Sequence, residues 1–242
     1  MENPLSQFEV YSIGKKLPFL GMDLSFNNAA LFMLIVFICI LMFFKISLKK
    51  ASLVPTKMQY LSEFSYSLVK SIIYDNIGKE KGHIFAPYLY TIFIFAFFTN
   101  ILGMVPGFFA INTQVIVPLT ISSLTLVIAT VYGLYTHKLR FFKRFYPSGV
   151  PLWLTPLIVP TEIISYFAQV LTMSIRLFAN ILAGHIILAV FTSFIFMAGW
   201  LGIIPFSFTV LILIFEVFVS ILQAYIFTVL SSIFIGEVVN LH

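Results

Sequence analysis

The sequence carries very little charge and almost no cysteine. Of its 242 residues, 10% are charged and 60% are hydrophobic, whereas about a quarter of the residues of a soluble protein are charged. Its single cysteine, Cys39, excludes an intramolecular disulfide and a metal site built from cysteines. The composition excludes a soluble domain and predicts an all-α polytopic membrane protein.

Residues 1–23 form a polar N-terminal lead that contains proline and glycine. They have neither the basic start and apolar run of a signal peptide nor the arginine-rich pattern of a transit peptide. Residues 24–242 are expected to form a single membrane domain.

Long apolar runs predict the membrane helices, because about 20 apolar residues span a bilayer. The runs predict three crossing helices in the first half of the chain and two longer ones after them, over residues 24–44, 84–109, 115–136, 160–198 and 206–237. The last two exceed the length of a perpendicular span, so we expect a strongly tilted hairpin with its turn near 199–206.

Residues 55–82 differ from these runs, since apolar side chains recur there at helical spacing among charged ones. This pattern predicts an amphipathic helix on the membrane surface. A solvated linker is the alternative interpretation.

The basic residues lie mainly in two segments. Seven of the 14 Lys and Arg fall between Lys45 and Lys81, and four more lie in the loop 137–147. Counting the predicted crossings places both segments on the same side of the membrane, which the positive-inside rule makes the cytoplasm or the matrix. The N-terminus is then expected outside and the C-terminus inside. With this distribution, the net charge of +5 does not indicate a nucleic-acid partner.

Between Gly149 and Gly236 the acidic, basic and histidine side chains are few: Glu162, Arg176, His185 and Glu216. An arginine at the centre of a membrane helix costs roughly 2.5–3.5 kcal/mol on insertion scales. Arg176 has more than 20 apolar-rich positions on both sides, so snorkelling to the interface is the less favoured explanation. We therefore interpret Arg176 as a functional residue.

On an ideal helix, six polar residues share one face, with Arg176 among them and the other five within roughly 40° of its direction. They are Glu162, Ser165, Gln169, Thr172, Arg176 and Asn180. The helix that follows has a second line of polar residues, which are Thr209, Glu216, Ser220 and Gln223. Glu and His can pass protons along such lines. Arginine stays protonated, repels cations and favours the ionised form of a nearby carboxylate. Since Glu162 lies roughly 21 Å away along the helix, the counter-charge of Arg176 is expected on another chain.

Several motifs resemble one family over nearly the whole chain. SIRLFANILAGH at 174–185, LQAYIFTVL at 222–230, FFTNILGMVP at 97–106, NPLSQFEV at 3–10 and the terminal NLH are similar to subunit a of the F-type ATP synthases, also called subunit 6. In sequence, these segments are most similar to those of mitochondrial and alphaproteobacterial members.

The resemblance implies a non-catalytic subunit that conducts protons beside a ring of c subunits, through two laterally offset half-channels. Arg176 matches the arginine that faces the ring and separates the half-channels, and Asn180 the asparagine one turn on. His185 and Glu216 match an acid–imidazole pair of the outer half-channel, with the two types exchanged relative to many bacterial members.

The resemblance also assigns the other positions. Gln223 matches a glutamine near the arginine, Glu162 an acidic position toward the inner half-channel, and Asn100 an asparagine of the second span. Gln169 joins the candidates from its place in the polar line. Gly103 departs from the pattern, because many bacterial members have aspartate there.

The remaining expectations concern cofactors, partners and location. No cofactor or metal is implied. The expected partners are the c-ring, the peripheral stalk and other membrane-sector subunits, lipid and protons. The mitochondrial inner membrane is expected, with the bacterial plasma membrane as the alternative.

Two other classes also place charges in a membrane. A secondary transporter is disfavoured because no inverted repeat is found. A haem-bearing electron-transfer subunit is disfavoured because, of the four histidines, His185 alone lies in mid-membrane.

Overall fold

The computed structural model describes residues 9–12, 18–19, 22–23, 25–49, 52–105, 108–146 and 154–240. Most of the polar lead 1–23, the motif NPLSQFEV except its last two residues, and the end of the NLH motif lie outside these ranges.

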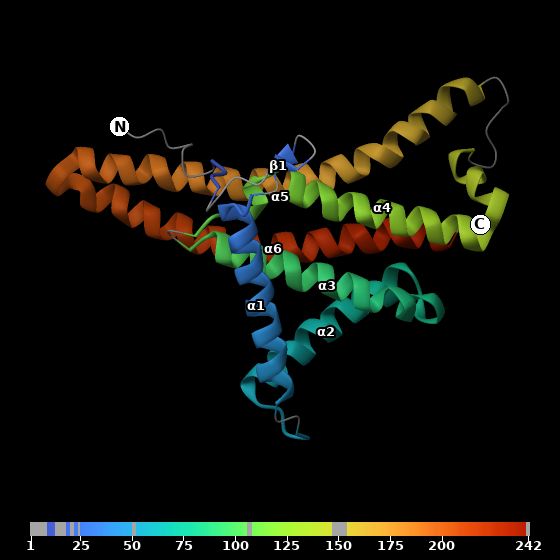
Figure 1. Cartoon of the computed structure of the whole chain (residues 1–242), viewed down its shortest axis with the longest axis horizontal. Coiled ribbons are helices and arrows are strands. Elements are labelled where there is room, and N and C mark those ends of the chain that lie inside the picture. The colour runs from blue at the N-terminus through green and yellow to red at the C-terminus, as the bar shows by residue number, and fades with distance from the viewer. Residues whose placement is uncertain are drawn as a thin grey trace. The chain divides into compact units, whose positions relative to one another are not determined.

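Helices make up nearly all of the described structure, which confirms the predicted helical class (Figure 1). The exception is a pair of two-residue antiparallel strands, β1 (Pro18–Phe19) and β2 (Met22–Asp23). The α-helices are α1 (Asn28–Leu48), α2 (Lys57–Asn76), α3 (Lys79–Gly103), α4 (Ile116–His137), α5 (Thr155–Ala198) and α6 (Ile203–Val239). The connections between them include the 3₁₀ segments η2 (Ile111–Thr113), η3 (Lys138–Phe145) and η5 (Gly199–Gly202).

Four described stretches are long and apolar enough to cross a membrane, judged by length and composition. They are Asn28–Leu48, Lys79–Gly103, Ile116–Phe142 and Thr155–Val239, the last of which contains both α5 and α6. Several long apolar helices of this kind are typical of a polytopic membrane protein.

Local signals explain where the helices begin and end. Asn27 caps α1, since its side chain accepts a hydrogen bond from the backbone N–H of Ala30 at 2.8 Å. The turns before α3 and after α5 contain Gly78 and Gly199, with φ of 95° and 57°, a region that glycine enters without steric cost. Helix α5 begins at Thr155 rather than near Pro160 as expected, with Pro160 inside the helix. A proline this close to a helix start leaves only a carbonyl of the first turn without its N–H partner.

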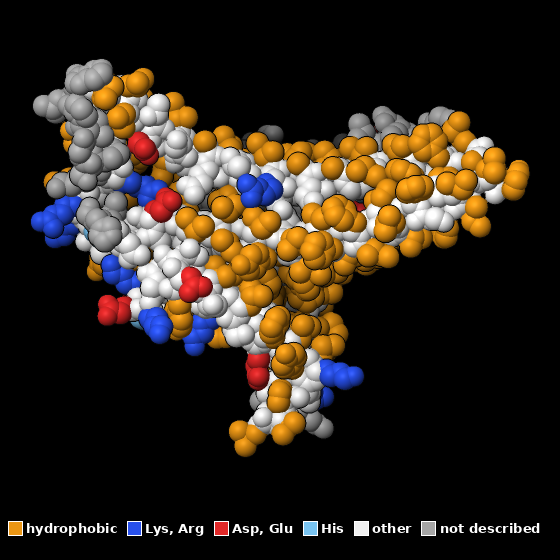
Figure 2. Space-filling model, turned by 180° about the vertical axis from the view of Figure 1, so that it is seen from behind, with side chains coloured by type: hydrophobic (Ala, Val, Ile, Leu, Met, Phe, Trp, Pro, Cys, Tyr) orange, Lys and Arg blue, Asp and Glu red, His pale blue; other side chains and the backbone are white. Residues whose placement is uncertain are grey.

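The chain divides into two compact units, which we describe separately. The first comprises Met1–Ser62, Ile94–Gln114 and Phe178–Ala224. Here the end of α5 and the start of α6 form a hairpin around η5 (Figure 1). Phe191 and Phe208 have their ring centroids 6.3 Å apart across this hairpin. Hydrophobic side chains cover most of its visible surface (Figure 2).

The second unit comprises Glu63–Phe93, Val115–Leu177 and Tyr225–His242. Its core contains a cluster of buried apolar side chains from α3, α5 and α6, namely Ile92, Met173, Leu177 and Phe227. The end of α2 is buried through Val69, Ile72 and Ile73, whereas Leu61 and Phe64 of the same helix are exposed.

Candidate functional site

In the second unit, the polar line of α5 lies on the exposed side of the helix. Glu162, Ser165, Thr172 and Arg176 are exposed, and Gln169 is half-buried. Within the described part of the chain, the Arg176 guanidinium has neither a hydrogen bond nor an ion pair. The structure therefore leaves this cation, on an apolar helix, without a neutralising group among the described residues.

A neighbouring face of this part of α5 is packed. Val170, Met173 and Leu177 are 7%, 2% and 0% exposed, and the last two belong to the apolar cluster of this unit. These three side chains point roughly 60–120° around the helix from Arg176, and Arg176 itself is exposed.

In the first unit, Glu216 of α6 lies directly against the backbone of α5. A β-carbon built on Gly184 would overlap Oε1 of Glu216 and would lie 2.5 Å from its Cδ. Glu216 is only 5% exposed, and neither carboxylate oxygen has a hydrogen-bond partner among the described residues. A buried carboxyl group without such a partner is unfavourable unless a proton, a water or a ligand satisfies it.

His185, the residue after Gly184, is hydrogen-bonded to α3 in the same unit. Its Nε2 donates to the carbonyl oxygen of Gly103 at 2.9 Å. The hydrogen bond places the proton of that tautomer on Nε2 and orients the ring. His185 and Glu216 thus lie in one unit, on neighbouring segments of the α5–α6 hairpin.

A buried amide network joins α3, η2 and α6 within the first unit. Asn100, fully buried, donates from Nδ2 to the carbonyl oxygen of Ser220 at 3.1 Å. Its Oδ1 accepts from Nδ2 of Asn112 at 2.7 Å, and the same nitrogen donates to Thr99 Oγ1 at 2.9 Å. Ser220 lies one helical turn after Glu216, so the network holds α6 next to the buried carboxyl group.

Two further predicted residues of this unit have amide nitrogens without a partner among the described residues. They are Nδ2 of the half-buried Asn180 and Nε2 of Gln223, which is 5% exposed. Together with Glu216, they give the first unit a set of buried polar atoms that a water or a proton carrier would satisfy.

The eight predicted site residues divide between the units. Asn100, Asn180, His185, Glu216 and Gln223 belong to the first, and Glu162, Gln169 and Arg176 to the second.

The sequence-based interpretation missed the parts played by Asn112 and Gly184. Asn112 reads as a turn residue, yet it is fully buried and donates to Asn100 and Thr99. Gly184 stands beside His185 in an apolar helix, where a glycine costs about 1 kcal/mol relative to alanine. A glycine at such a position indicates that another group packs closely against the helix backbone, and this was the sequence feature that could have predicted the contact with Glu216.

We expect Asn100→Ala to destabilise the protein by about 1–3 kcal/mol, because it leaves the Ser220 carbonyl and the Asn112 amide buried without this partner. Thermal unfolding of the purified protein in detergent measures the effect. The control is Thr120→Ala, since among the described residues the exposed Thr120 hydroxyl bonds only within its own helix, to Ile116. Equal melting temperatures for the two variants would contradict a stabilising role of the network.

The fold and the buried groups define an all-helical membrane protein with ionisable and amide groups set inside its apolar helices. Residues 30–236 match the family described as ATP synthase A chain. The chain is 43% identical to ATP synthase subunit a of Pelagibacter ubique (strain HTCC1062), over 99% of this chain and 98% of that protein. It is 35% identical to ATP synthase subunit a of Rhodospirillum rubrum over the full length of both.

The chain therefore belongs to the ATP synthase subunit a family. Members of this family are the proton-translocating subunit in the membrane sector of the ATP synthase and not its catalytic subunit. Membership favours this class over the secondary transporter and the haem-bearing subunit.

Proposed function

We propose that the chain provides two offset half-channels through which protons reach and leave the carboxylates of a c-ring, with Arg176 as the barrier between them. The observation that carries the proposal is the exposed Arg176 guanidinium, which has no partner in the described chain although it lies on an apolar helix. A carboxylate on a neighbouring subunit supplies the missing counter-charge. Because arginine does not release its proton, it attracts that carboxylate in ionised form and passes no proton itself.

The outer half-channel is assigned to the polar groups of the first unit. Glu216 and His185 are its relay, since a carboxyl group and an imidazole exchange protons at working pH. Asn180 and Gln223 contribute buried amide nitrogens that orient water or the arriving carboxyl group. Asn100 holds α6 at Ser220, one turn from Glu216.

The inner half-channel is assigned to the exposed face of α5 in the second unit. Glu162 is exposed and Gln169 half-buried on the helix face that also carries Arg176. At 1.5 Å per residue, Glu162 lies roughly 21 Å along the helix from the arginine. An exposed carboxylate at that distance serves as the exit for protons that leave the ring.

The arrangement in the membrane follows from the same proposal. Helices α5 and α6 lie strongly tilted beside the c-ring, and α2 lies on the membrane surface. The N-terminus is outside and the C-terminus inside, with the peripheral stalk and other membrane-sector subunits as further partners. Both relatives named above are bacterial proteins, which favours the bacterial plasma membrane over the mitochondrial inner membrane.

Reconstitution of the complete synthase in liposomes tests the proposal. We expect ATP-driven acidification of the lumen that is inhibited by a reagent that modifies the ring carboxylate. An absence of pumping with protons, but transport with sodium, would contradict the proton assignment. An absence of both would contradict the proposed half-channels.

A double-mutant cycle tests whether His185 and Glu216 form one relay. We expect His185→Ala and Glu216→Ala each to lower ATP-driven proton flux, and the double variant to lose less than the sum of the two effects. The sum is taken on the free-energy scale, as logarithms of the rates. Strict additivity would mean that the two groups act independently.

A further inference from the structure

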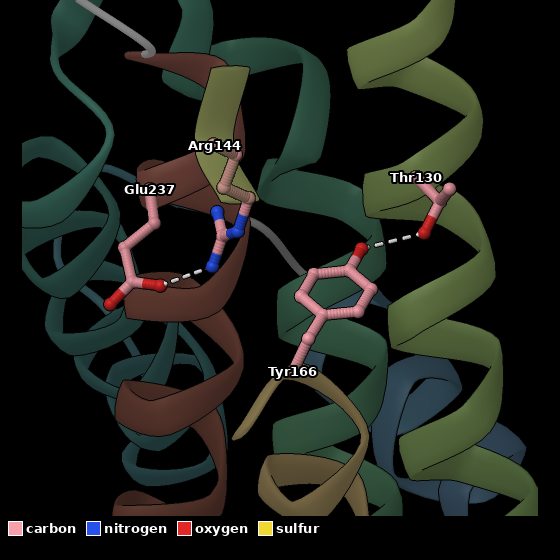
Figure 3. Close-up of polar contacts among 4 residues, drawn as sticks. All are labelled: Thr130, Arg144, Tyr166 and Glu237. Carbon is pink, nitrogen blue, oxygen red and sulfur yellow. Dashed lines mark hydrogen bonds and ion pairs between the residues drawn. The ribbon is translucent and has the colours of Figure 1, made fainter. Parts of the chain in front are cut away.

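Arg144 of η3 contacts two helices of the second unit, α5 and α6. Its Nη2 lies 2.6 Å from Oε2 of Glu237 on α6, and its side chain is 15% exposed. Its guanidinium carbon lies 5.1 Å from the ring centroid of Tyr166 on α5 and 5.7 Å from that of Phe234 on α6. Figure 3 shows the guanidinium between the carboxylate and the tyrosine ring.

Tyr166 extends this cluster to α4. Its hydroxyl lies 2.6 Å from Oγ1 of Thr130 (Figure 3). Thr130 donates its own hydroxyl proton to the carbonyl oxygen of Leu126 at 2.6 Å, so Tyr166 is the donor to Thr130. Tyr166 is 6% exposed, and its ring centroid lies 5.0 Å from that of Phe234. The tyrosine is therefore held on its face by a cation and at its tip by a hydrogen bond.

This part of α5 needs such directional contacts, because its apolar residues do not distinguish one side from the other. Ile164, Phe167, Leu171 and Ile175 are large apolar residues that are 51–65% exposed, while Val170, Met173 and Leu177 are buried. In a membrane, lipid and protein interior are similarly apolar, and hydrophobicity does not drive one face inward. Packing shape and directional polar contacts must set the rotation of the helix about its axis.

We propose that Arg144 is a positioning residue that sets the rotation of α5, and through it the direction in which Arg176 points. Tyr166 lies ten residues before Arg176, which is roughly 15 Å along the same helix. A turn of the helix at Tyr166 is carried to Arg176, because the backbone hydrogen bonds of the helix resist twisting. The inference about function rests on the proposed role of Arg176; the inference about helix rotation does not.

Cysteine reactivity reports the rotation directly. Thr172 is exposed and Ser174 is fully buried, and two residues apart on a helix means roughly opposite faces. The experiment uses the complete synthase, in which Cys39→Ser removes the native cysteine of this chain. Thr172→Cys and Ser174→Cys are then introduced one at a time, and the rate at which each reacts with a membrane-permeant maleimide is measured. We expect Thr172→Cys to react faster, and Arg144→Gln to change the ratio of the two rates by about fivefold in favour of position 174.

Matched variants separate positioning from general damage. Arg140→Gln removes an exposed cation from the same segment η3 and is expected to leave the labelling ratio and the pumping rate unchanged. Arg144→Lys keeps the charge but not the planar group, so we expect a smaller change of the same sign. Glu237→Gln is expected to shift the ratio as Arg144→Gln does, and the double variant to shift it no further.

The two inferences fail differently. An unchanged labelling ratio in assembled Arg144→Gln synthase would overturn the positioning role. A changed ratio with a parallel loss of ATP-driven pumping supports both inferences. A changed ratio with full pumping supports the control of helix rotation by Arg144 and overturns its consequence for Arg176.

Discussion

Arg176→Ala abolishes proton-driven ATP synthesis while protons still pass through the membrane sector. The arginine is the exposed cation on the polar line of α5, and no described residue neutralises it. A nearby opposite charge favours the ionised form of a carboxyl group by a factor of about 10 to 1000. Without the arginine, a ring carboxyl group can pass position 176 in either direction while protonated, so we expect protons to cross between the proposed half-channels without driving net rotation of the ring.

The measurement compares two properties of reconstituted synthase. ATP synthesis under an imposed proton gradient is expected to fall below about 1% of the wild-type rate, which corresponds to the upper part of that range. Passive proton flux sensitive to a ring-carboxylate reagent is expected to persist. Arg140→Ala is the matched control, because it removes an exposed arginine outside the polar line. Normal synthesis in Arg176→Ala would refute the barrier.

Gly184→Val lowers ATP-driven proton flux by a factor of about 10 to 100 and leaves the stability nearly unchanged. A β-carbon at position 184 overlaps the end of the Glu216 side chain, which is flexible and moves away. A displacement of about 1 Å in a reacting group can reduce a rate about 100-fold. The protein folds normally, because the atom displaced belongs to the end of a side chain and not to the backbone.

The control for this variant is Gly103→Ala, also in the first unit. A β-carbon there lies 3.4 Å from that of Ala110, an ordinary contact, and the backbone carbonyl that accepts from His185 remains. We expect wild-type flux in Gly103→Ala, an intermediate loss in Gly184→Ala, and similar melting temperatures for all three variants. Wild-type flux in Gly184→Val would show that the position of Glu216 does not matter.

Features that depend on local sequence can be predicted from the sequence alone. The apolar runs predict helices because a backbone in lipid must satisfy its own hydrogen bonds, and the described helices α1, α3, α4, α5 and α6 are apolar over such lengths. The spacing of Glu162, Gln169 and Arg176 predicts a shared face because a helix repeats every 3.6 residues, and the structure leaves that face largely exposed.

Contacts between distant segments required the tertiary structure. Helix α5 is apolar on several sides, so its sequence does not reveal that Met173 and Leu177 pack inward. Helix α5 begins at Thr155, five residues before the start that we expected near Pro160. In a sequence, a proline indicates a helix boundary, and only the structure shows that Pro160 lies inside the first turns of the helix.

The sequence by itself determined the class of the protein, its family and the residues that put charge into apolar helices, since hydrophobicity and helical periodicity act within a few turns of chain. Only the tertiary structure decided that Glu216 rests on Gly184, that Asn112 holds Asn100, and that Arg144 joins Glu237 to Tyr166. Most of these contacts join residues that are far apart in the chain, and even the nearer pair, Asn100 and Asn112, meets only because the chain turns back between α3 and η2. Such pairs depend on how closely the backbones approach, which no local pattern records.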